Sequence, residues 1–182
     1  MSKVILITGA SSGIGKSAAE FLSAKGFKVY GTGRNPKINE KNGYSLIPLD
    51  VTKPETISLA IDSIIKIEGR LDVLVNNAGY GQFGCTEDIT LDDFRKQFET
   101  NFFSIVRIIQ EVSPIMRNQK SGTIVNISSV VGKIGLPGSP AYISTKFALE
   151  GFSECLRYEL GQFGIKITLI EPGVIKTNFF NS

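Results

Sequence analysis

Short apolar segments alternate with longer amphipathic segments along the whole chain. Strands are predicted at residues 3–8, 27–33, 44–50, 71–76, 122–128 and 165–171, and helices at 13–25, 54–68, 91–118 and 140–163. The segments at 4–7 and 73–75 are continuously apolar, which is typical of strands buried on both faces of a parallel sheet. This alternation constrains the fold more than any other feature of the sequence.

Repeated strand–helix units are joined by right-handed crossovers, which place helices on the faces of a sheet. The pattern therefore predicts an α/β fold of the Rossmann type. We expect a doubly wound, mostly parallel sheet in three α/β/α layers, with strand order 3-2-1-4-5-6. No repeat, linker or low-complexity stretch interrupts the 182 residues, so a single domain spanning residues 1–182 is predicted.

Composition and charge exclude several classes of protein. With 42% hydrophobic and 20% charged residues, the chain has the composition of a soluble globular protein. A net charge of +3 without a run of basic residues does not indicate nucleic acid or a membrane as partner. No segment has the pattern of a signal peptide or a membrane span, and the two cysteines suggest neither a disulfide framework nor a metal site. A cytoplasmic protein without a metal is expected.

A glycine-rich turn, TGASSGIG at residues 8–15, follows the first predicted strand and leads directly into a helix. Glycines let the backbone turn sharply and let a pyrophosphate approach the amides at the helix N-terminus. The spacing differs from the common G-x-G-x-x-G fingerprint, and a turn that binds nothing is the alternative. Its position after the first strand favours a phosphate site.

Arg34, at the end of the second predicted strand, indicates which dinucleotide is preferred. An acidic residue at this point would bind the ribose hydroxyls of NAD, whereas an arginine can neutralise the 2′-phosphate of NADP. The nearest carboxylate downstream is Glu40. We therefore predict that NADP(H) is preferred and that NAD(H) is possible; the alternative is that Arg34 is a solvated surface charge.

Ser129, Tyr142 and Lys146 are the candidate catalytic residues. Ser129 precedes Tyr142 by thirteen residues, and Lys146 follows it by four, so the tyrosine and the lysine project from one face of a helix. The ammonium is expected to lower the phenol pKa from its usual value of about 10. Tyr142 would then act as general acid and base in a chain that contains no histidine.

The predicted start of this helix supports the same expectation. Ser139 is a good N-cap residue, and Pro140 suits the first helical position. Tyr142 then falls in the first turn, where the positive end of the helix dipole also favours a phenolate. Both effects are expected to lower the same pKa.

Polar and small residues follow three further predicted strands. Asp50 and Val51 end the third strand, residues 76–79 the fourth and residues 126–129 the fifth. The carboxyl ends of parallel strands form the ligand-binding edge of an open α/β sheet. We therefore expect these segments to meet the turn at residues 8–15 in one crevice.

With these motifs the chain strongly resembles the short-chain dehydrogenase/reductase family, over nearly all of its length. The motifs that carry the resemblance are Thr8-Gly9-x-x-x-Gly13-x-Gly15, Asn76-Asn77-Ala78-Gly79, the helical Asn101, Ser129, Tyr142-x-x-x-Lys146 and Pro172-Gly173. The pair Tyr142-x-x-x-Lys146 is weak by itself, but the motifs are jointly very specific in this order. The resemblance implies an NADP-preferring oxidoreductase.

The resemblance also implies a role for each matching residue. Tyr142 would exchange a proton with the substrate oxygen, Ser129 would orient that oxygen, and Lys146 would lower the phenol pKa and hold the nicotinamide ribose. Asn101 would anchor a water relay behind the lysine. The implied cofactor-binding residues are Gly9, Ser11, Ser12, Gly13, Ile14, Arg34, Asp50, Val51, Asn77, Ala78, Gly79, Tyr142, Lys146, Pro172, Gly173 and Thr177.

A stripe of aromatic residues runs along the predicted helix at 91–118. Phe94, Phe98 and Phe102 recur every four positions, which indicates packing before any other use. Asn101, considered alone, would likewise be a polar residue on a packed helix. As a second use of the stripe, we expect a homodimer or homotetramer formed through the long helices.

The sequence ends at Ser182, soon after Pro172-Gly173, whereas family members usually continue with a lid helix and a last strand. Residues 165–171 would then form an apolar sheet edge, which invites pairing. We therefore expect a C-terminally truncated domain that lacks this lid helix and strand. The remaining substrate wall would be residues 79–85 and 130–140.

The leading hypothesis is an NADP(H)-dependent oxidoreductase that transfers hydride between the nicotinamide and a carbonyl or secondary alcohol carbon of a small-molecule substrate. The alternative is a dinucleotide-binding sensor or interaction protein without turnover. An epimerase or dehydratase of the related extended scaffold would favour a different glycine turn and a longer chain. A Ser-His-Asp hydrolase is excluded because the chain has no histidine.

Overall fold

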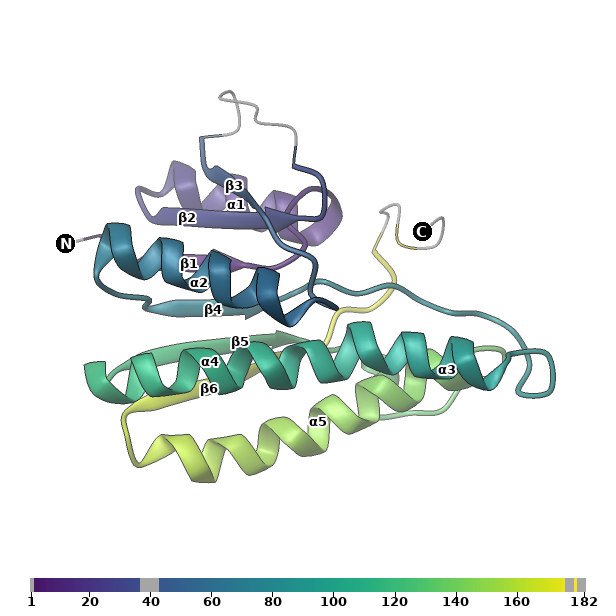
Figure 1. The fold of residues 1–182 in the computed structure, drawn as a ribbon. Coiled ribbons are helices and arrows are strands. Elements are labelled where there is room, and N and C mark those ends of the chain that lie inside the picture. The colour runs from purple at the N-terminus through teal and green to yellow at the C-terminus, as the bar shows by residue number, and fades with distance from the viewer. Residues whose placement is uncertain (1, 37–42, 176–178, 180–182) are drawn as a thin grey trace.

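The computed structural model describes residues 2–36, 43–175 and 179 and confirms the predicted architecture (Figure 1). Within these residues, six strands pair in parallel in the order β3-β2-β1-β4-β5-β6. The strands are β1 (Val4–Ile7), β2 (Lys28–Gly33), β3 (Ser45–Pro48), β4 (Val73–Asn76), β5 (Gly122–Ile127) and β6 (Ile165–Ile170). The α-helices are α1 (Gly13–Ala24), α2 (Pro54–Glu68), α3 (Leu91–Phe98), α4 (Ser104–Gln119) and α5 (Pro140–Gly161).

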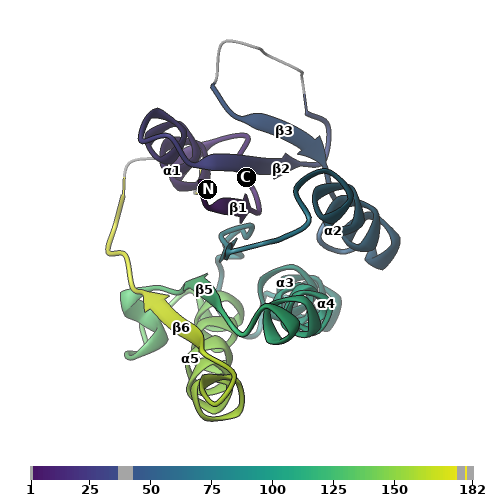
Figure 2. The same ribbon diagram turned by 90° about the vertical axis from the view of Figure 1, so that its left-hand side faces the viewer.

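Helices cover both faces of the sheet. α1 lies on one face beside β1 and β2, whereas α2, α4 and α5 lie on the other (Figure 2). Successive residues of a strand point to opposite faces, so Leu6 belongs to the larger core, while Ile5 and Ile7 belong to the smaller core beside α1. β1 is continuously apolar because both of its faces are buried.

The single helix predicted over residues 91–118 is interrupted. α3 ends at Phe98, the segment η2 (Glu99–Phe103) is π-helical, and α4 begins at Ser104. Asn101 lies in the middle of η2 and is buried. A π-helical turn replaces i→i−4 hydrogen bonds by wider ones and is frequent at functional sites, but it leaves no distinct apolar period in the sequence.

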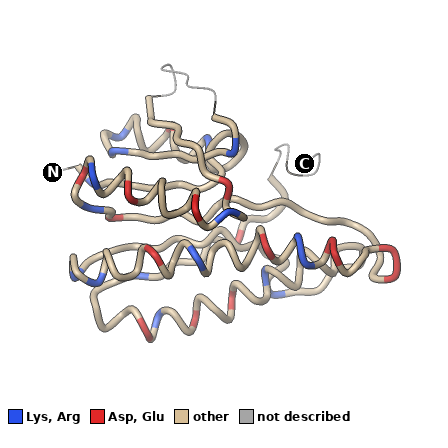
Figure 3. The backbone as a smooth tube through the Cα atoms, viewed as in Figure 1, with Lys and Arg blue, Asp and Glu red and all other residues tan. Residues whose placement is uncertain are grey.

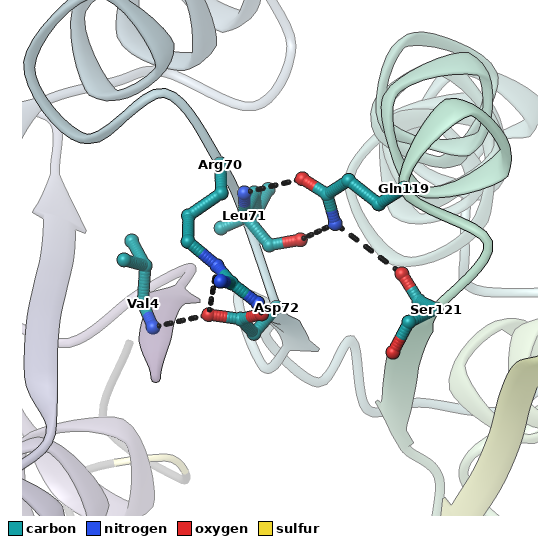
Figure 4. A network of polar contacts seen from close by, with 6 residues as sticks. All are labelled: Val4, Arg70, Leu71, Asp72, Gln119 and Ser121. Atoms are coloured by element: carbon teal, nitrogen blue, oxygen red, sulfur yellow. Dashed lines mark hydrogen bonds and ion pairs between the residues drawn. The ribbon is translucent and has the colours of Figure 1, made fainter. Parts of the chain in front are cut away.

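A polar network joins β1, β4 and α4 at the amino ends of the strands (Figure 4). Asp72 accepts a hydrogen bond from the Val4 amide at 2.8 Å and pairs with Arg70. Gln119 bonds both the amide and the carbonyl of Leu71, at 3.0 and 2.9 Å. These contacts hold together the amino ends of the strands. An open α/β sheet binds its ligands at the opposite side, beyond the carboxyl ends of the strands.

The outer surface carries mixed charges. Lys and Arg are interspersed with Asp and Glu along the helices (Figure 3). No helix among the described residues is long and apolar enough to cross a membrane. β6 has a neighbour on one side only in the described sheet, as expected of an edge strand. Ile165 and Ile167 are buried in the larger core, and the exposed apolar part of the strand is Ile170, at 46%.

Candidate active site

The side chains of Ser129, Tyr142 and Lys146 meet beyond the carboxyl end of β5. Ser129 precedes the short helix η3 (Val130–Gly132), and the other two residues lie in the first two turns of α5. Ser129 lies near enough to the Tyr142 phenol to affect its pKa, and Lys146 Nζ lies 5.6 Å from the centre of the Tyr142 ring. The spacing in the sequence therefore corresponds to proximity in space.

The expectation of a lowered Tyr142 pKa is wrong for the chain by itself. Burial raises the pKa of the phenol above its usual value, and the nearby Ser129 hydroxyl acts in the opposite direction without overcoming it. Lys146 donates instead to the Ile127 carbonyl at 2.7 Å, so its ammonium is directed at the backbone. Tyr142 is therefore protonated at neutral pH.

The start of α5 is only partly as expected. Ser139 occupies the N-cap position and Pro140 the first helical position. The Ser139 side chain, however, makes no capping hydrogen bond to the described backbone. Its φ of −147° and ψ of 39° lie outside the extended region that aims an N-cap side chain at the first turn.

Lys146 is a buried cation. The whole residue is only 7% exposed. Burial lowers the pKa of the ammonium to about 8, and the carboxylate of Glu150, one turn later on α5, acts to raise it. Below about pH 8 the buried lysine therefore carries its charge beside Tyr142.

Asn101 supports the loop that follows β4. Its Oδ1 accepts from the Tyr80 amide at 3.1 Å, and its Nδ2 donates to the Tyr80 carbonyl at 2.9 Å and reaches Thr145 Oγ1 at 3.4 Å. Gln97, one turn earlier, donates to the same carbonyl at 2.8 Å. We did not predict Gln97, although its position four residues before Asn101 was a usable signal. The water relay stays a prediction.

The glycine-rich turn packs against the loop after β4, as expected. Thr8 Oγ1 accepts hydrogen bonds from the amides of Asn77 and Ala78, both at 3.0 Å. Asn77 Nδ2 donates to the carbonyls of Thr8 and Gly9. Gly9 has a φ of +67°, and a Cβ there would lie 2.8 Å from Ala78 Cα, so only glycine fits. Sequence reasoning missed Thr8 as the residue that holds the two segments together.

The amino end of α1 fits an anionic group. Ser12 occupies the N-cap position, but its hydroxyl makes no capping bond within the described part of the chain. Ser11 and Ser12 are exposed, Ile14 is partly exposed, and Gly13 has a φ of +55° that brings the backbone into the turn. The first amides of a helix lack partners within the helix, so they can bind the pyrophosphate of a dinucleotide.

Arg34 and Asp50 lie at the same edge. Arg34 is exposed directly after β2. Burial raises the Asp50 pKa, but the hydrogen bonds from Thr52 and the charges of Lys53 and Arg34 outweigh it and lower the pKa below its usual value. Val51, next in the chain, is buried in the larger core.

The segment after β6 joins the turn after β5. The Val130 amide donates to the Pro172 carbonyl at 3.1 Å, and Ser129 Oγ contacts the same carbonyl at 3.5 Å. Gly173 is exposed. These contacts bring Pro172 and Gly173 next to the candidate catalytic residues, whereas Thr177 lies outside the described residues.

Apolar side chains are exposed on the two segments predicted to form the substrate wall. The two predicted wall segments, residues 79–85 and 130–140, carry large exposed apolar residues. These are Phe83, Val130, Ile134 and Leu136. The Phe179 ring lies 5.5 Å from the Tyr142 ring in an edge-on arrangement, so an aromatic face borders the phenol.

The aromatic stripe packs the helices together. Phe102 contacts Phe98 and Phe103 on its own helical segment and Phe152 on α5, with ring centres 5.4 to 6.3 Å apart. The expectation of a packing stripe is therefore confirmed for Phe98 and Phe102. Phe103 and Phe147 remain 46% exposed, and the homodimer or homotetramer through these helices stays a prediction.

Comparison with known proteins gives consistent matches. The family model described as short chain dehydrogenase matches residues 3–182. The 3-ketodihydrosphingosine reductase of Bacteroides thetaiotaomicron is 45% identical over 177 residues, which cover 97% of this chain and 65% of that protein. This chain therefore spans less than two thirds of the length of that relative.

Two solved structures have the same fold. A short-chain dehydrogenase from Streptomyces avermitilis has a TM-score of 0.93 and 41% identity, covering 98% of this chain and 68% of that one. The structure of ElxO with NADP bound has a TM-score of 0.92 and 36% identity, covering 100% of this chain and 77% of that one. At these identities the likeness extends beyond the fold to the sequence.

Proposed function

The chain belongs to the short-chain dehydrogenase family, and from this premise we propose that it is an NADP(H)-dependent oxidoreductase acting on a carbonyl or secondary alcohol carbon. The observation that carries the proposal is the meeting of Ser129, Tyr142 and Lys146 at the sheet edge where the glycine-rich turn lies. A nicotinamide dinucleotide, when bound, supplies or accepts the hydride. The chain's own residues handle the proton and the substrate oxygen.

Tyr142 is the proposed proton donor in the direction of reduction. Because burial keeps its phenol protonated at neutral pH, the proton is available where the substrate oxygen gains charge. Ser129 would hydrogen-bond the same oxygen and orient it. The Lys146 ammonium, 5.6 Å from the ring centre, would stabilise the phenolate left after proton transfer.

The proposed dinucleotide site lies across residues 8–15, 76–79 and Arg34. The open first turn of α1 and the tight packing of Gly9 on Ala78 fit a pyrophosphate. We propose that Arg34 selects NADP(H), because an exposed guanidinium at the end of β2 can pair with a 2′-phosphate. A solved relative, ElxO, binds NADP, which supports this choice.

Arg34→Ala is expected to weaken NADPH binding about tenfold or more, since a charge-assisted contact is worth about 1.5–3 kcal/mol. NADH binding should change little, because NADH has no 2′-phosphate. Fluorescence titration with each dinucleotide measures both effects. Arg95→Ala, another exposed arginine on α3, is the control and should leave both affinities unchanged. Equal weakening of NADH and NADPH by Arg34→Ala would contradict the role.

We propose a bulky apolar ketone as the substrate class. The exposed side chains of Phe83, Ile134 and Leu136 on the two wall segments offer apolar surface, and Phe179 borders the Tyr142 phenol. A relative with 45% identity is a 3-ketodihydrosphingosine reductase, whose name refers to a 3-keto compound. Apolar contact with such walls would stabilise a long chain more than a short one.

A series of ketones of increasing chain length tests the proposed function. We expect NADPH absorbance to fall during turnover, with kcat/KM rising by up to about fourfold per added methylene until the wall is filled, since a buried methylene contributes about 0.8 kcal/mol. A flat series would contradict the apolar substrate. Binding of NADPH without turnover of any ketone or aldehyde would favour the alternative, a dinucleotide-binding sensor.

A further inference from the structure

Glu150 is a second buried charge on the helix that carries the candidate catalytic residues. It is 6% exposed and follows Lys146 by four residues, so both side chains lie on one face of α5. Burying a carboxylate is costly unless other groups compensate its charge. The proposed chemistry uses Lys146 but gives Glu150 no role.

Lys146 and Glu150 contact the two ends of the turn at residues 127–132, which runs from the last residue of β5 to the end of η3. Lys146 Nζ donates to the Ile127 carbonyl at 2.7 Å. A Cβ built on Gly132 would lie 2.9 Å from Ser128 Oγ and 3.1 Å from Glu150 Oε1, so the carboxylate packs directly against this turn. The two charged side chains therefore hold adjacent parts of the segment that carries the candidate catalytic serine.

Among the described residues, one cation, Lys133, pairs with the Glu150 carboxylate. Lys133 Nζ lies 2.9 Å from Glu150 Oε2 and also 3.6 Å from Glu171, which follows β6. Both carboxylate oxygens of Glu150 are buried, and neither accepts a hydrogen bond from a described residue, so the contact of Lys133 with Oε2 is an ion pair. Lys133 is half exposed, so solvent weakens its hold on Glu150.

We propose that Glu150 is a positioning residue whose carboxylate keeps Lys146 in its ammonium form beside Tyr142, and that Lys133 limits how strongly Glu150 acts. Glu150 follows Lys146 by one turn of α5, and Tyr142 is the titratable group beside Lys146 on the same helix. Glu150 pairs with Lys133, after η3, and Lys133 also contacts Glu171, after β6. The inference rests on the proposed function, in which Lys146 must be charged.

The electrostatics of Lys146 agree with this role. Burial lowers the pKa of Lys146 to about 8, and Glu150 is the named charge that opposes the change. The folded-state pKa lies below the usual value of the lysine, so the ammonium is lost as the pH rises through about 8. Without the Glu150 charge, this loss would begin nearer to neutral pH.

An NMR titration of the Lys146 Cε signal, assigned with Lys146→Arg, tests the inference on the full chain without substrate or cofactor. In Glu150→Gln the midpoint should fall by about one pH unit, because the nearby negative charge is removed. In Lys133→Gln it should rise, because Glu150 then acts on Lys146 alone. A mere loosening of the structure would move both variants in the same direction.

Glu150→Asp retains the negative charge, so the midpoint of the Lys146 titration should stay close to its value in the unsubstituted chain. An unchanged midpoint in folded Glu150→Gln, or shifts of the same sign in both variants, would overturn the inference. If Glu150→Gln does not fold, Lys133→Gln decides: a rise supports the role and no rise refutes it. The titration needs no turnover, so it is independent of the proposed function. If the chain is inactive but the midpoint falls in Glu150→Gln and rises in Lys133→Gln, only the proposed function is refuted.

Discussion

Tyr142→Phe is expected to reduce turnover about 10²- to 10⁴-fold, the usual contribution of a general acid or base. The substitution removes only the phenolic oxygen, which is the atom that gives the proton to the substrate. The ring keeps its edge-on contact with Phe179, and the Lys146 contact with the ring is retained. NADPH binding should therefore stay within about twofold of the unsubstituted chain, because no charged contact is lost.

Steady-state rates with NADPH and a ketone substrate, together with an NADPH titration, separate these two effects. Tyr158→Phe is the matched control, because Tyr158 lies on the same helix and is 85% exposed. Its rate should be unchanged. Full turnover in Tyr142→Phe, or equal losses in the two variants, would show that the phenol of Tyr142 is not the proton donor.

Gly15→Ala is expected to destabilise the chain by about 2–4 kcal/mol, as overpacking in a close-packed region does. A Cβ at this position would lie 2.5 Å from the Gly9 carbonyl oxygen and 2.4 Å from Asn77 Nδ2. The first neighbour is backbone and cannot rotate away. The glycine-rich turn or the start of α1 must therefore move.

The same change should weaken NADPH binding about tenfold or more, because the turn that it displaces holds the proposed pyrophosphate site. Urea unfolding and NADPH titration measure the two losses. Gly151→Ala is the control: Gly151 lies inside α5 with no atom of another described residue within 4 Å of its added Cβ. That change should stabilise by up to about 1 kcal/mol, since alanine favours a helix over glycine. A Gly15→Ala protein of unchanged stability would contradict the packing described here.

Most of the fold was predictable from the periodicity of apolar residues, which differs between helices and strands. β1 is buried on both faces, so its apolar run had one interpretation. α2 starts at Pro54 and ends before Gly69, which takes a left-handed φ of +69°, and both residues are strong local signals. Tyr142 and Lys146 lie one turn apart on any helix, so their proximity needed no tertiary information.

Other features depend on which groups the fold buries. The Tyr142 phenol is buried, and burial raises its pKa more than the nearby Ser129 hydroxyl lowers it. The pKa shift is therefore opposite to the expected one. Gln97 and Thr8 hydrogen-bond to backbone groups of Tyr80 and Asn77, which are distant in the chain. A single sequence does not reveal which distant backbone groups a side chain will meet. The π-helical turn around Asn101 likewise lacks a local pattern.

The sequence alone indicated the layered α/β architecture, because periodicity acts over short stretches of chain. The strand order followed from the doubly wound pattern, and the three candidate catalytic residues followed from their spacing and from the resemblance to the family. Only the tertiary structure decided their electrostatic state. Desolvation, the approach of Glu150 and the direction of the Lys146 ammonium depend on how separate segments enclose one another. Proximity of Tyr142 and Lys146 was therefore predictable, whereas the protonation of each was not.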